Sequence, residues 1–173
     1  IVFKKNIYLI TIHPDSNDVS QFRKQITCLW NVLTRDQDVT LIFTMANADR
    51  GGNVINNLLK QFVETDSRAY LFQSLGRLRY LSLMKISSAV IGNSSSGIVE
   101  APSLKIPTIN IGNRQTGRIK ADSIIDCNYE EQKFSEALAK IDNTEFREML
   151  KNVNNPYFKN GDSSESILKH IKG

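Results

Sequence analysis

Hydrophobic residues along the chain alternate between short continuous runs and longer stretches with helical spacing. The first run covers residues 7–12, and the apolar residues within 19–33 fall on one helical face. Apolar runs of about four to eight residues are typical of strands buried on both faces of a parallel sheet. The pattern therefore predicts a strand over residues 7–12 and a helix over residues 19–33, whose N-cap would be Asp18.

The same alternation continues along the chain. Further strands are expected at residues 39–45, 69–72, 89–91, 108–111 and around 124–125. Helices are expected over residues 54–63, around Leu78, Leu81 and Met84, in a short segment after residue 97, near 130–141 and 143–152, and from about Ser164. This succession predicts a doubly wound, Rossmann-like α/β domain with a parallel sheet. Ligands of such folds bind outside the carboxyl ends of the strands, so the loops at that edge should hold any site.

Composition narrows the class of protein. The chain has 173 residues, of which 40% are hydrophobic and 23% charged, as expected for one globular domain. Its 22 Lys and Arg against 18 Asp and Glu give a net charge of +4, and no basic run is longer than Lys4-Lys5. We therefore expect no nucleic-acid partner and no membrane-binding segment.

Cysteine usage bears on the compartment. Cys28 and Cys127 lie far apart, and the sequence shows no signal-peptide pattern. Both features favour free thiols in a reducing compartment, so we expect a cytoplasmic protein. The spacing of cysteine and histidine suggests no metal site. The chain begins at Ile1 rather than Met, which we interpret as one part of a longer polypeptide.

The strongest local signal is the small-residue turn within residues 92–100, which follows a predicted strand and precedes a predicted helix. The first turn of a helix presents unpaired N–H groups and a partial positive charge, which suit a phosphate or pyrophosphate. Gly92 and Gly97 would allow the backbone to approach a ligand, and three serine hydroxyls would add donors. The alternative is a helix that one of these serines merely caps.

Three titratable side chains are expected beside this turn. Glu100 would lie about one helical turn further on, where a carboxylate suits the hydroxyls of a ribose or simply complements the helix dipole. Arg114 could make a bidentate contact to a phosphate, whereas Arg118 is expected to be a solvated surface residue. His13, at the end of the first strand, could donate to a phosphate or act as a general acid, or be an ordinary polar residue at a loop start.

Two long stretches, residues 91–103 and 106–118, resemble a known family, and the similarity extends to residues 11–14 and 47–49. They resemble the C-terminal half of the hydrolysing UDP-N-acetylglucosamine 2-epimerases of sialic-acid and capsule biosynthesis. The resemblance implies the C-terminal lobe of a GT-B-type two-lobe fold. Residues 1–153 would form the Rossmann-like nucleotide-binding lobe, and residues 154–173 a joint and a helix able to cross to the N-terminal lobe.

The resemblance also implies roles for individual residues. The diphosphate and ribose would be bound by Ser94, Ser95, Ser96, Gly97 and Glu100. His13 and Arg114 would be catalytic residues on the phosphate side of the cleft. Asn47 would lie nearer the sugar, although its loop is equally typical of an ordinary turn, and Leu75 and Gly76 would lie nearer the uracil.

Members of this family remove a proton at C2 of the sugar, eliminate UDP from C1, and add water to the resulting glycal to release N-acetylmannosamine. The resemblance therefore implies a UDP-sugar substrate, no cofactor and no metal. The acid/base carboxylates are expected in the N-terminal lobe of the same polypeptide, so this lobe alone should be inactive. The full-length protein is expected to form homo-oligomers.

Alternatives remain within and beyond the family. Pro14 after His13 favours the hydrolysing branch, because the non-hydrolysing branch usually has Arg there. Close relatives accept UDP-N,N'-diacetylbacillosamine, so the sugar stays open. The donor-binding lobe of a GT-B glycosyltransferase would have the same fold and is a further alternative.

Overall fold

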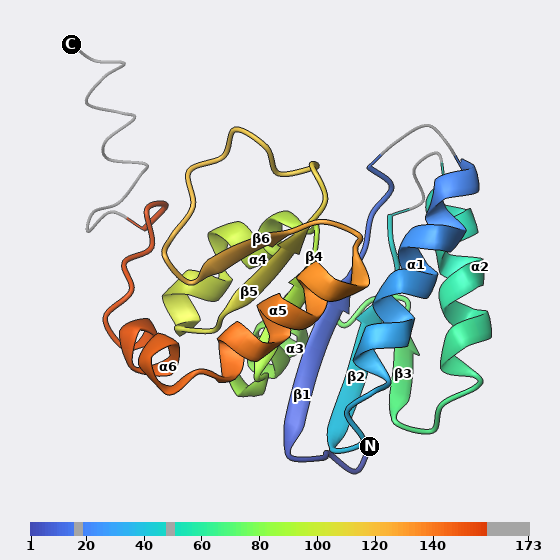
Figure 1. Cartoon of the computed structure of the whole chain (residues 1–173), viewed down its shortest axis with the longest axis horizontal. Coiled ribbons are helices and arrows are strands. Elements are labelled where there is room, and N and C mark those ends of the chain that lie inside the picture. Colours follow the sequence, from blue (N-terminus) through green and yellow to red (C-terminus); the bar gives the residue numbers. More distant parts are fainter. Residues whose placement is uncertain (16–18, 48–50, 159–173) are drawn as a thin grey trace.

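The computed structural model describes residues 1–15, 19–47 and 51–158. Six strands form one parallel sheet in the order β3-β2-β1-β4-β5-β6. Their bounds are β1 (Asn6–Thr11), β2 (Val39–Thr44), β3 (Ala69–Phe72), β4 (Ala89–Gly92), β5 (Thr108–Ile111) and β6 (Ile124–Cys127). The chain builds outward from β1 to β3, then returns to place β4 on the other side of β1 (Figure 1). This reversal confirms the doubly wound architecture and creates a crevice between β1 and β4.

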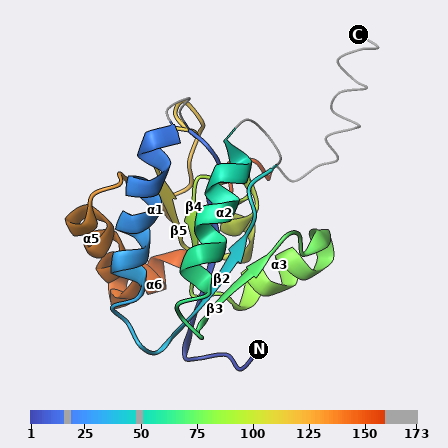
Figure 2. The same cartoon turned by 90° about the vertical axis from the view of Figure 1, so that its right-hand side faces the viewer.

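Helices cover both faces of the sheet. They are α1 (Val19–Leu33), α2 (Gly52–Val63), α3 (Gly76–Ile86), α4 (Ser95–Val99), the 3-10 helix η1 (Ala101–Leu104), α5 (Glu131–Asp142) and α6 (Thr144–Leu150). The larger core lies under α1, α2, α5 and α6, and the smaller one under α3 and η1. Figure 2 shows α3 on the opposite side of the sheet from α1.

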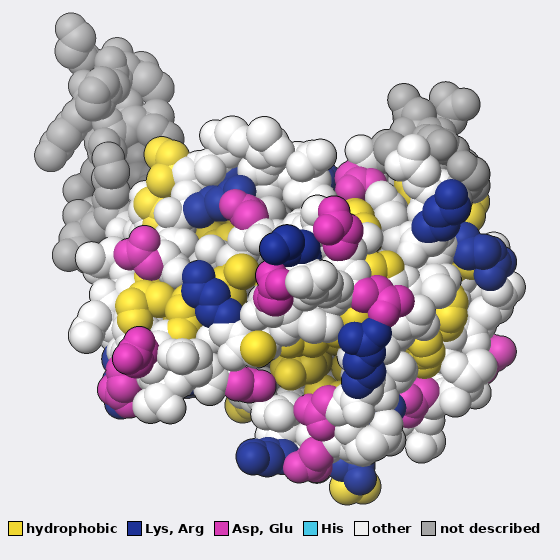
Figure 3. Space-filling model, in the orientation of Figure 1, with side chains coloured by type: hydrophobic (Ala, Val, Ile, Leu, Met, Phe, Trp, Pro, Cys, Tyr) yellow, Lys and Arg dark blue, Asp and Glu magenta, His cyan; other side chains and the backbone are white. Residues whose placement is uncertain are grey.

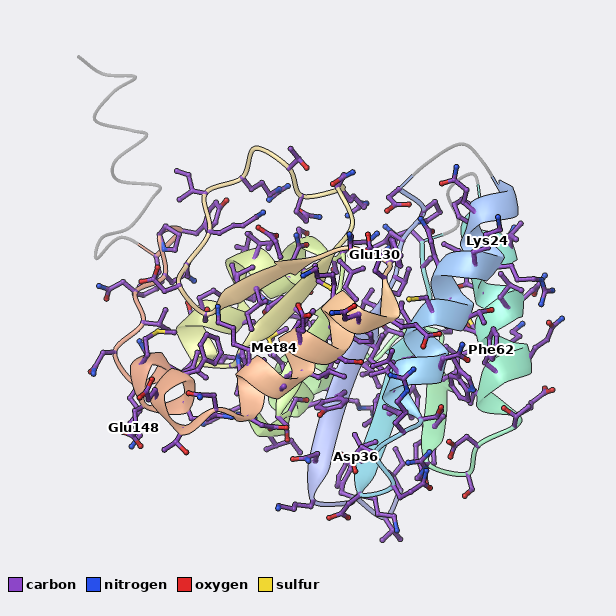
Figure 4. All side chains as sticks on the ribbon, viewed as in Figure 1. Lys24, Asp36, Phe62, Met84, Glu130 and Glu148 are labelled. Atoms are coloured by element: carbon purple, nitrogen blue, oxygen red, sulfur yellow. The ribbon has the colours of Figure 1, made fainter. Side chains whose placement is uncertain are left out.

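Burial explains why these segments fold as they do. β2 is buried along its whole length, and Leu9 and Ile10 of β1 are each 0% exposed although they point to opposite faces. On the larger core, Trp30 of α1 and Phe62 of α2 pack with their ring centroids 5.3 Å apart. Phe62 is labelled in Figure 4. The hydrophobic runs of the sequence therefore become strands with helices on both faces.

The surface is mixed in charge. Over the face that carries α1 and α5, acidic and basic side chains are interspersed (Figure 3). Several of them pair, including Arg35 with Glu131 and Lys133 with Glu136. Within residues 1–15, 19–47 and 51–158, no helix combines the length and apolar character needed to cross a membrane.

The differences from the sequence predictions are small. The bounds predicted for β3 and β5 are confirmed, and β1 lies one residue earlier than expected. The last predicted helix and the predicted N-cap Asp18 lie outside the described residues. In α3, Met84 is buried but Leu78 is 81% exposed, because only one side of this helix rests on the sheet.

Candidate functional site

A cleft of about 890 Å³ opens at the carboxyl ends of β1, β2, β3 and β4. Residues from the loops after these strands and from α2 and α3 line it. Seven of the residues predicted from the sequence are among them: His13, Asn47, Leu75, Gly76, Ser94, Ser96 and Glu100. The structure thus brings together side chains that are up to 87 positions apart, from His13 to Glu100.

The remaining predicted residues lie around this cleft rather than in its lining. Ser95 is half-buried in the first turn of α4, and Arg114 is exposed in the loop after β5. Of the loop after β2, Asn47 is exposed and lines the cleft, whereas residues 48–50 lie outside the described part.

Both glycines of the turn after β4 serve internal packing. A Cβ at Gly97 would lie 2.7 Å from Cγ2 of Thr108, so α4 packs closely on β5 at this point. Gly92 has a φ of 132°, and a Cβ there would lie 2.0 Å from the carbonyl oxygen of Thr11. The absence of a Cβ at both positions is therefore required by internal packing, and the approach of a ligand to their backbone stays a prediction. The room they provide is filled by the protein itself.

The start of α4 is not capped by a serine side chain. Ser94 occupies the N-cap position with extended backbone, but its hydroxyl accepts no hydrogen bond from the amides of the helix. Instead, Ser96 Oγ donates to Ser94 Oγ at 3.1 Å and lies 2.7 Å from the hydroxyl oxygen of Tyr80. The capping alternative is therefore wrong. The Gly97 amide donates to the Ser94 carbonyl at 3.3 Å, which leaves the Ser95 and Ser96 amides for another acceptor.

The helix behind this turn is short, as the sequence predicts. α4 has 5 residues, and Glu100 forms its C-cap at the junction with η1. The Glu100 amide donates to the carbonyl of Ser96 at 2.9 Å. Glu100 is half-buried and lines the cleft. An anion here would therefore be bound by individual amides and hydroxyls rather than by the dipole of a long helix, which falls off beyond the end turns.

Asn93 connects the loops on the two sides of the crevice. Its side chain is 0% exposed: Oδ1 accepts the His13 amide at 2.7 Å, and Nδ2 donates to the His13 carbonyl at 2.8 Å. The Asn93 carbonyl accepts Nη1 of Arg114 at 3.2 Å and Nε2 of Gln115 at 2.8 Å. The structure therefore joins His13 and Arg114 through one residue.

Two neighbours of the site gave no functional signal in the sequence. Gln115 is only 2% exposed although it lies in a polar loop. Tyr80 occupies an ordinary position of α3, yet its hydroxyl reaches Ser96 across the cleft. Burial raises the pKa of Tyr80 above its usual value of 10.0, against the effect of its hydrogen bonds with Ser96 and Thr11. Tyr80 is therefore a neutral phenol that can donate to Ser96 at physiological pH.

A second asparagine holds the loop after β2 in the same way. Asn56 of α2 accepts the Ala46 amide at 2.8 Å and donates to the Ala46 carbonyl at 3.1 Å. Ala46 lies two residues after the end of β2, as His13 does after β1. In the described residues, no group of three or more His, Cys, Asp or Glu side chains is arranged to hold a metal ion.

Comparison with known proteins identifies the family. The family described as UDP-N-acetylglucosamine 2-epimerase matches residues 2–172. This chain belongs to the UDP-N-acetylglucosamine 2-epimerase family. It is 45% identical over 145 residues to the "GDP/UDP-N,N'-diacetylbacillosamine 2-epimerase (hydrolyzing)" of Campylobacter jejuni, a match that covers 83% of this chain and 37% of that protein. It is 34% identical over 156 residues to the polysialic acid biosynthesis protein P7 of Escherichia coli, covering 90% of this chain and 40% of P7.

Solved structures agree on the fold of this epimerase-family chain. It is similar to S. aureus MnaA in complex with UDP, with a TM-score of 0.76 and 18% identity over 98% of this chain and 45% of that one. This confirms the predicted doubly wound, Rossmann-like fold of the chain. The chain spans about two fifths of the length of its curated relatives. The family is one of enzymes, as the name of the C. jejuni relative states.

Proposed function

We propose that this chain is the UDP-binding lobe of a hydrolysing 2-epimerase, which converts UDP-N-acetylglucosamine and water into N-acetylmannosamine and UDP. One observation carries the proposal. In a chain that belongs to the epimerase family, the cleft beside the β1–β4 crevice combines the uncapped start of α4 with Glu100 and His13. Uncapped amides suit an anion, and a carboxylate nearby suits sugar hydroxyls, so together they fit a nucleoside diphosphate.

The diphosphate would lie against the first amides of α4 and the hydroxyls of Ser94, Ser95 and Ser96. UDP gains negative charge as its bond to C1 of the sugar breaks. Donors that are already in place stabilise this charge without reorganisation, and Arg114 adds a positive charge close by. His13 lines the cleft with its backbone fixed by Asn93, which suits it to donate a proton to the leaving group.

The nucleoside would extend away from α4. Glu100 would accept hydrogen bonds from the ribose hydroxyls, and the turn at Leu75 and Gly76 would contact the uracil. Asn47 would lie on the side of the sugar. All four residues line the same cleft, whose volume of about 890 Å³ falls in the range typical of small-molecule sites.

The sugar chemistry would need the N-terminal lobe of the same polypeptide. A base there removes the proton at C2 while UDP leaves from C1, and water then adds across the double bond of the glycal, with hydroxyl at C1 and hydrogen at C2. Residues 154–173 would form the joint and the crossing helix. The isolated lobe would therefore bind UDP without turnover, and the complete enzyme would act in the cytoplasm, as a homo-oligomer.

A second candidate substrate is UDP-N,N'-diacetylbacillosamine. The 45% identity to the C. jejuni enzyme named for that sugar favours it. The two sugars differ at C4, where the second carries an acetamido group in place of a hydroxyl, and at C6, where it lacks the hydroxyl. The residues that contact these positions are expected in the other lobe. A comparison of kcat/KM for the two UDP-sugars in the full-length enzyme decides between them.

The binding part of the proposal is tested by calorimetric titration of the full-length protein with UDP. Arg114→Ala and Glu100→Ala should each weaken UDP binding by about 10- to 100-fold, because each removes a charge-assisted contact of roughly 1–3 kcal/mol. Arg118→Ala, in the same exposed loop, is the matched control and should change affinity less than about twofold. A full-length protein without affinity for UDP contradicts the proposal.

The chemical part is tested by running the reaction in heavy water. Release of UDP without an acceptor, together with deuterium at C2 of the free sugar, supports elimination followed by hydration. Release of UDP only when an acceptor sugar is present would instead identify a glycosyltransferase.

A further inference from the structure

We infer that Asn93 is a positioning residue that sets His13 and Arg114 relative to one another across the crevice between β1 and β4. The inference rests on the proposed function, because it assigns the geometry of the same site. Asn93 lies directly after β4, at the point where the two strands stop pairing. It is the residue through which the loops after β1, β4 and β5 meet.

The backbone ladder between β1 and β4 ends at this residue. Thr11 and Gly92 form the last pair of the two strands, and the Asn93 amide donates to the Thr11 carbonyl at 3.2 Å. Beyond this bond, the backbone of β4 turns away into α4. The Asn93 side chain replaces it, because its amide group accepts from and donates to His13 as a neighbouring strand would.

Burial separates this role from ligand binding. Asn93 is 0% exposed, and both Oδ1 and Nδ2 of its side chain are engaged by His13. A ligand in the cleft cannot reach these atoms. Asn93 therefore acts through the residues that it holds.

The carbonyl of Asn93 fixes the other partner. It accepts Nη1 of Arg114 at 3.2 Å and Nε2 of Gln115 at 2.8 Å. Gln115 is buried and anchors the loop after β5, while Arg114 is exposed and has further N–H groups for a phosphate. A shift of Asn93 would move the histidine and the arginine together.

Asn56 provides the matched comparison. It makes the same pair of hydrogen bonds to Ala46, at 2.8 and 3.1 Å, but Ala46 carries no titratable side chain. Ala46 and Asn56 line the same cleft, so loss of these two hydrogen bonds tests what such an asparagine pair contributes beside the cleft without a titratable side chain at the residue it holds. Loss of the two Asn93 hydrogen bonds should have the same kind of effect and, in addition, displace His13 and Arg114.

The test is a double-mutant cycle in the full-length enzyme, with UDP release and UDP calorimetry as readouts. Asn93→Ala should lower kcat by about 100-fold, since a displacement on the order of 1 Å at a reacting group can cost that much. In a His13→Ala background, Asn93→Ala should lower kcat by no more than about threefold.

The binding readout uses Arg114 in the same way. Asn93→Ala should weaken UDP binding about tenfold in the wild-type background and should weaken it no further in the Arg114→Ala background. Asn56→Ala should lower kcat by the same factor with or without His13.

Equal losses from Asn93→Ala in the wild-type and His13→Ala backgrounds would overturn the inference, because Asn93 would then support only the fold. If Asn93→Ala does not fold, the isosteric Asn93→Asp keeps the acceptor for the His13 amide, loses the donor to its carbonyl, and enters the same cycle. A wild-type protein that neither binds nor releases UDP would overturn the proposed function and this inference with it. If the wild-type protein is active and the losses in kcat caused by Asn93→Ala and His13→Ala are additive in free energy, only the inference is overturned.

Discussion

The two sides of the cleft are held by different kinds of contact. On the β4 side, which comprises residues 92–100 and the chain after β1, partly buried hydrogen bonds join Asn93 to His13, and Ser96 to the hydroxyl of Tyr80 further along α3. On the α3 side, residues 73–77 are exposed apart from the half-buried Leu75. This turn is closed by a hydrogen bond from the Gly76 amide to Ser74 Oγ at 3.2 Å.

This difference predicts different roles for the two sides in ligand binding. Donors that stabilise a developing charge are most effective when they are fixed beforehand, because nothing has to reorganise when the charge appears. An exposed turn can adjust to the shape of what it contacts. We therefore expect strict recognition of the diphosphate on the β4 side and tolerant recognition of the base on the α3 side.

The largest expected effect concerns the backbone of the two sides. Gly92→Ala should destabilise the chain by at least about 3 kcal/mol, because it combines a positive φ with a Cβ placed 2.0 Å from a carbonyl oxygen. Gly76 also has a positive φ, of 65°, but no atom lies within 4 Å of its Cβ position. Gly76→Ala should therefore cost only about 1 kcal/mol. Urea-induced unfolding measures both, and equal losses would remove the distinction between the two sides.

The next effect concerns ligands. Uridine, which lacks the diphosphate, should bind to the full-length protein at least about 100-fold more weakly than UDP, since it forfeits the charge-assisted contacts of the β4 side. GDP, which keeps the diphosphate and changes the base, should bind within about tenfold of UDP. Competition calorimetry gives both ratios. A larger loss with GDP than with uridine would mean that the α3 side is the selective one.

The smallest effect compares two serines. Ser96→Ala removes one of the two hydrogen-bond partners of the partly buried Tyr80 hydroxyl, the other being Thr11, and should cost about 1 kcal/mol of stability. Ser74→Ala removes an exposed bond to the Gly76 amide and should cost less than about 0.5 kcal/mol. Thermal unfolding without ligand checks the pair. A cost for Ser74→Ala that matches Ser96→Ala would show that the α3 turn is as firmly held as the β4 side.

The strands and the general place of the site could be predicted because their signals are local. Residues 41–43 and 89–91 are continuous apolar runs, and short runs of this kind between helical patterns become buried parallel strands. The carboxyl edge followed from the architecture, and His13, Ser94 and Glu100 all line the cleft found there.

The roles that escaped prediction depend on distant partners. Asn93 gains its role from a residue 80 positions away, and Tyr80 from one 16 positions away. The close packing of Gly97 on β5 was not predicted, because a glycine beside a ligand and a glycine beneath a helix look alike in sequence. Thr108, which fills the space next to Gly97, comes from the following strand. Such contacts become visible only when the elements are packed.

The long separation between His13 and Asn93 also has a kinetic meaning. β1 and β2 are separated in sequence only by α1. His13 and Asn93 are separated by α1, β2, α2, β3, α3 and β4, so their contact closes a much longer loop. Closing longer loops costs more entropy, and contacts remote in sequence form slowly. During refolding, we expect the amides of β1 and β2 to become protected from hydrogen exchange before the His13 amide does. The cleft is thus assembled late, and a chain interrupted before β4 would contain a partly formed sheet without a binding site.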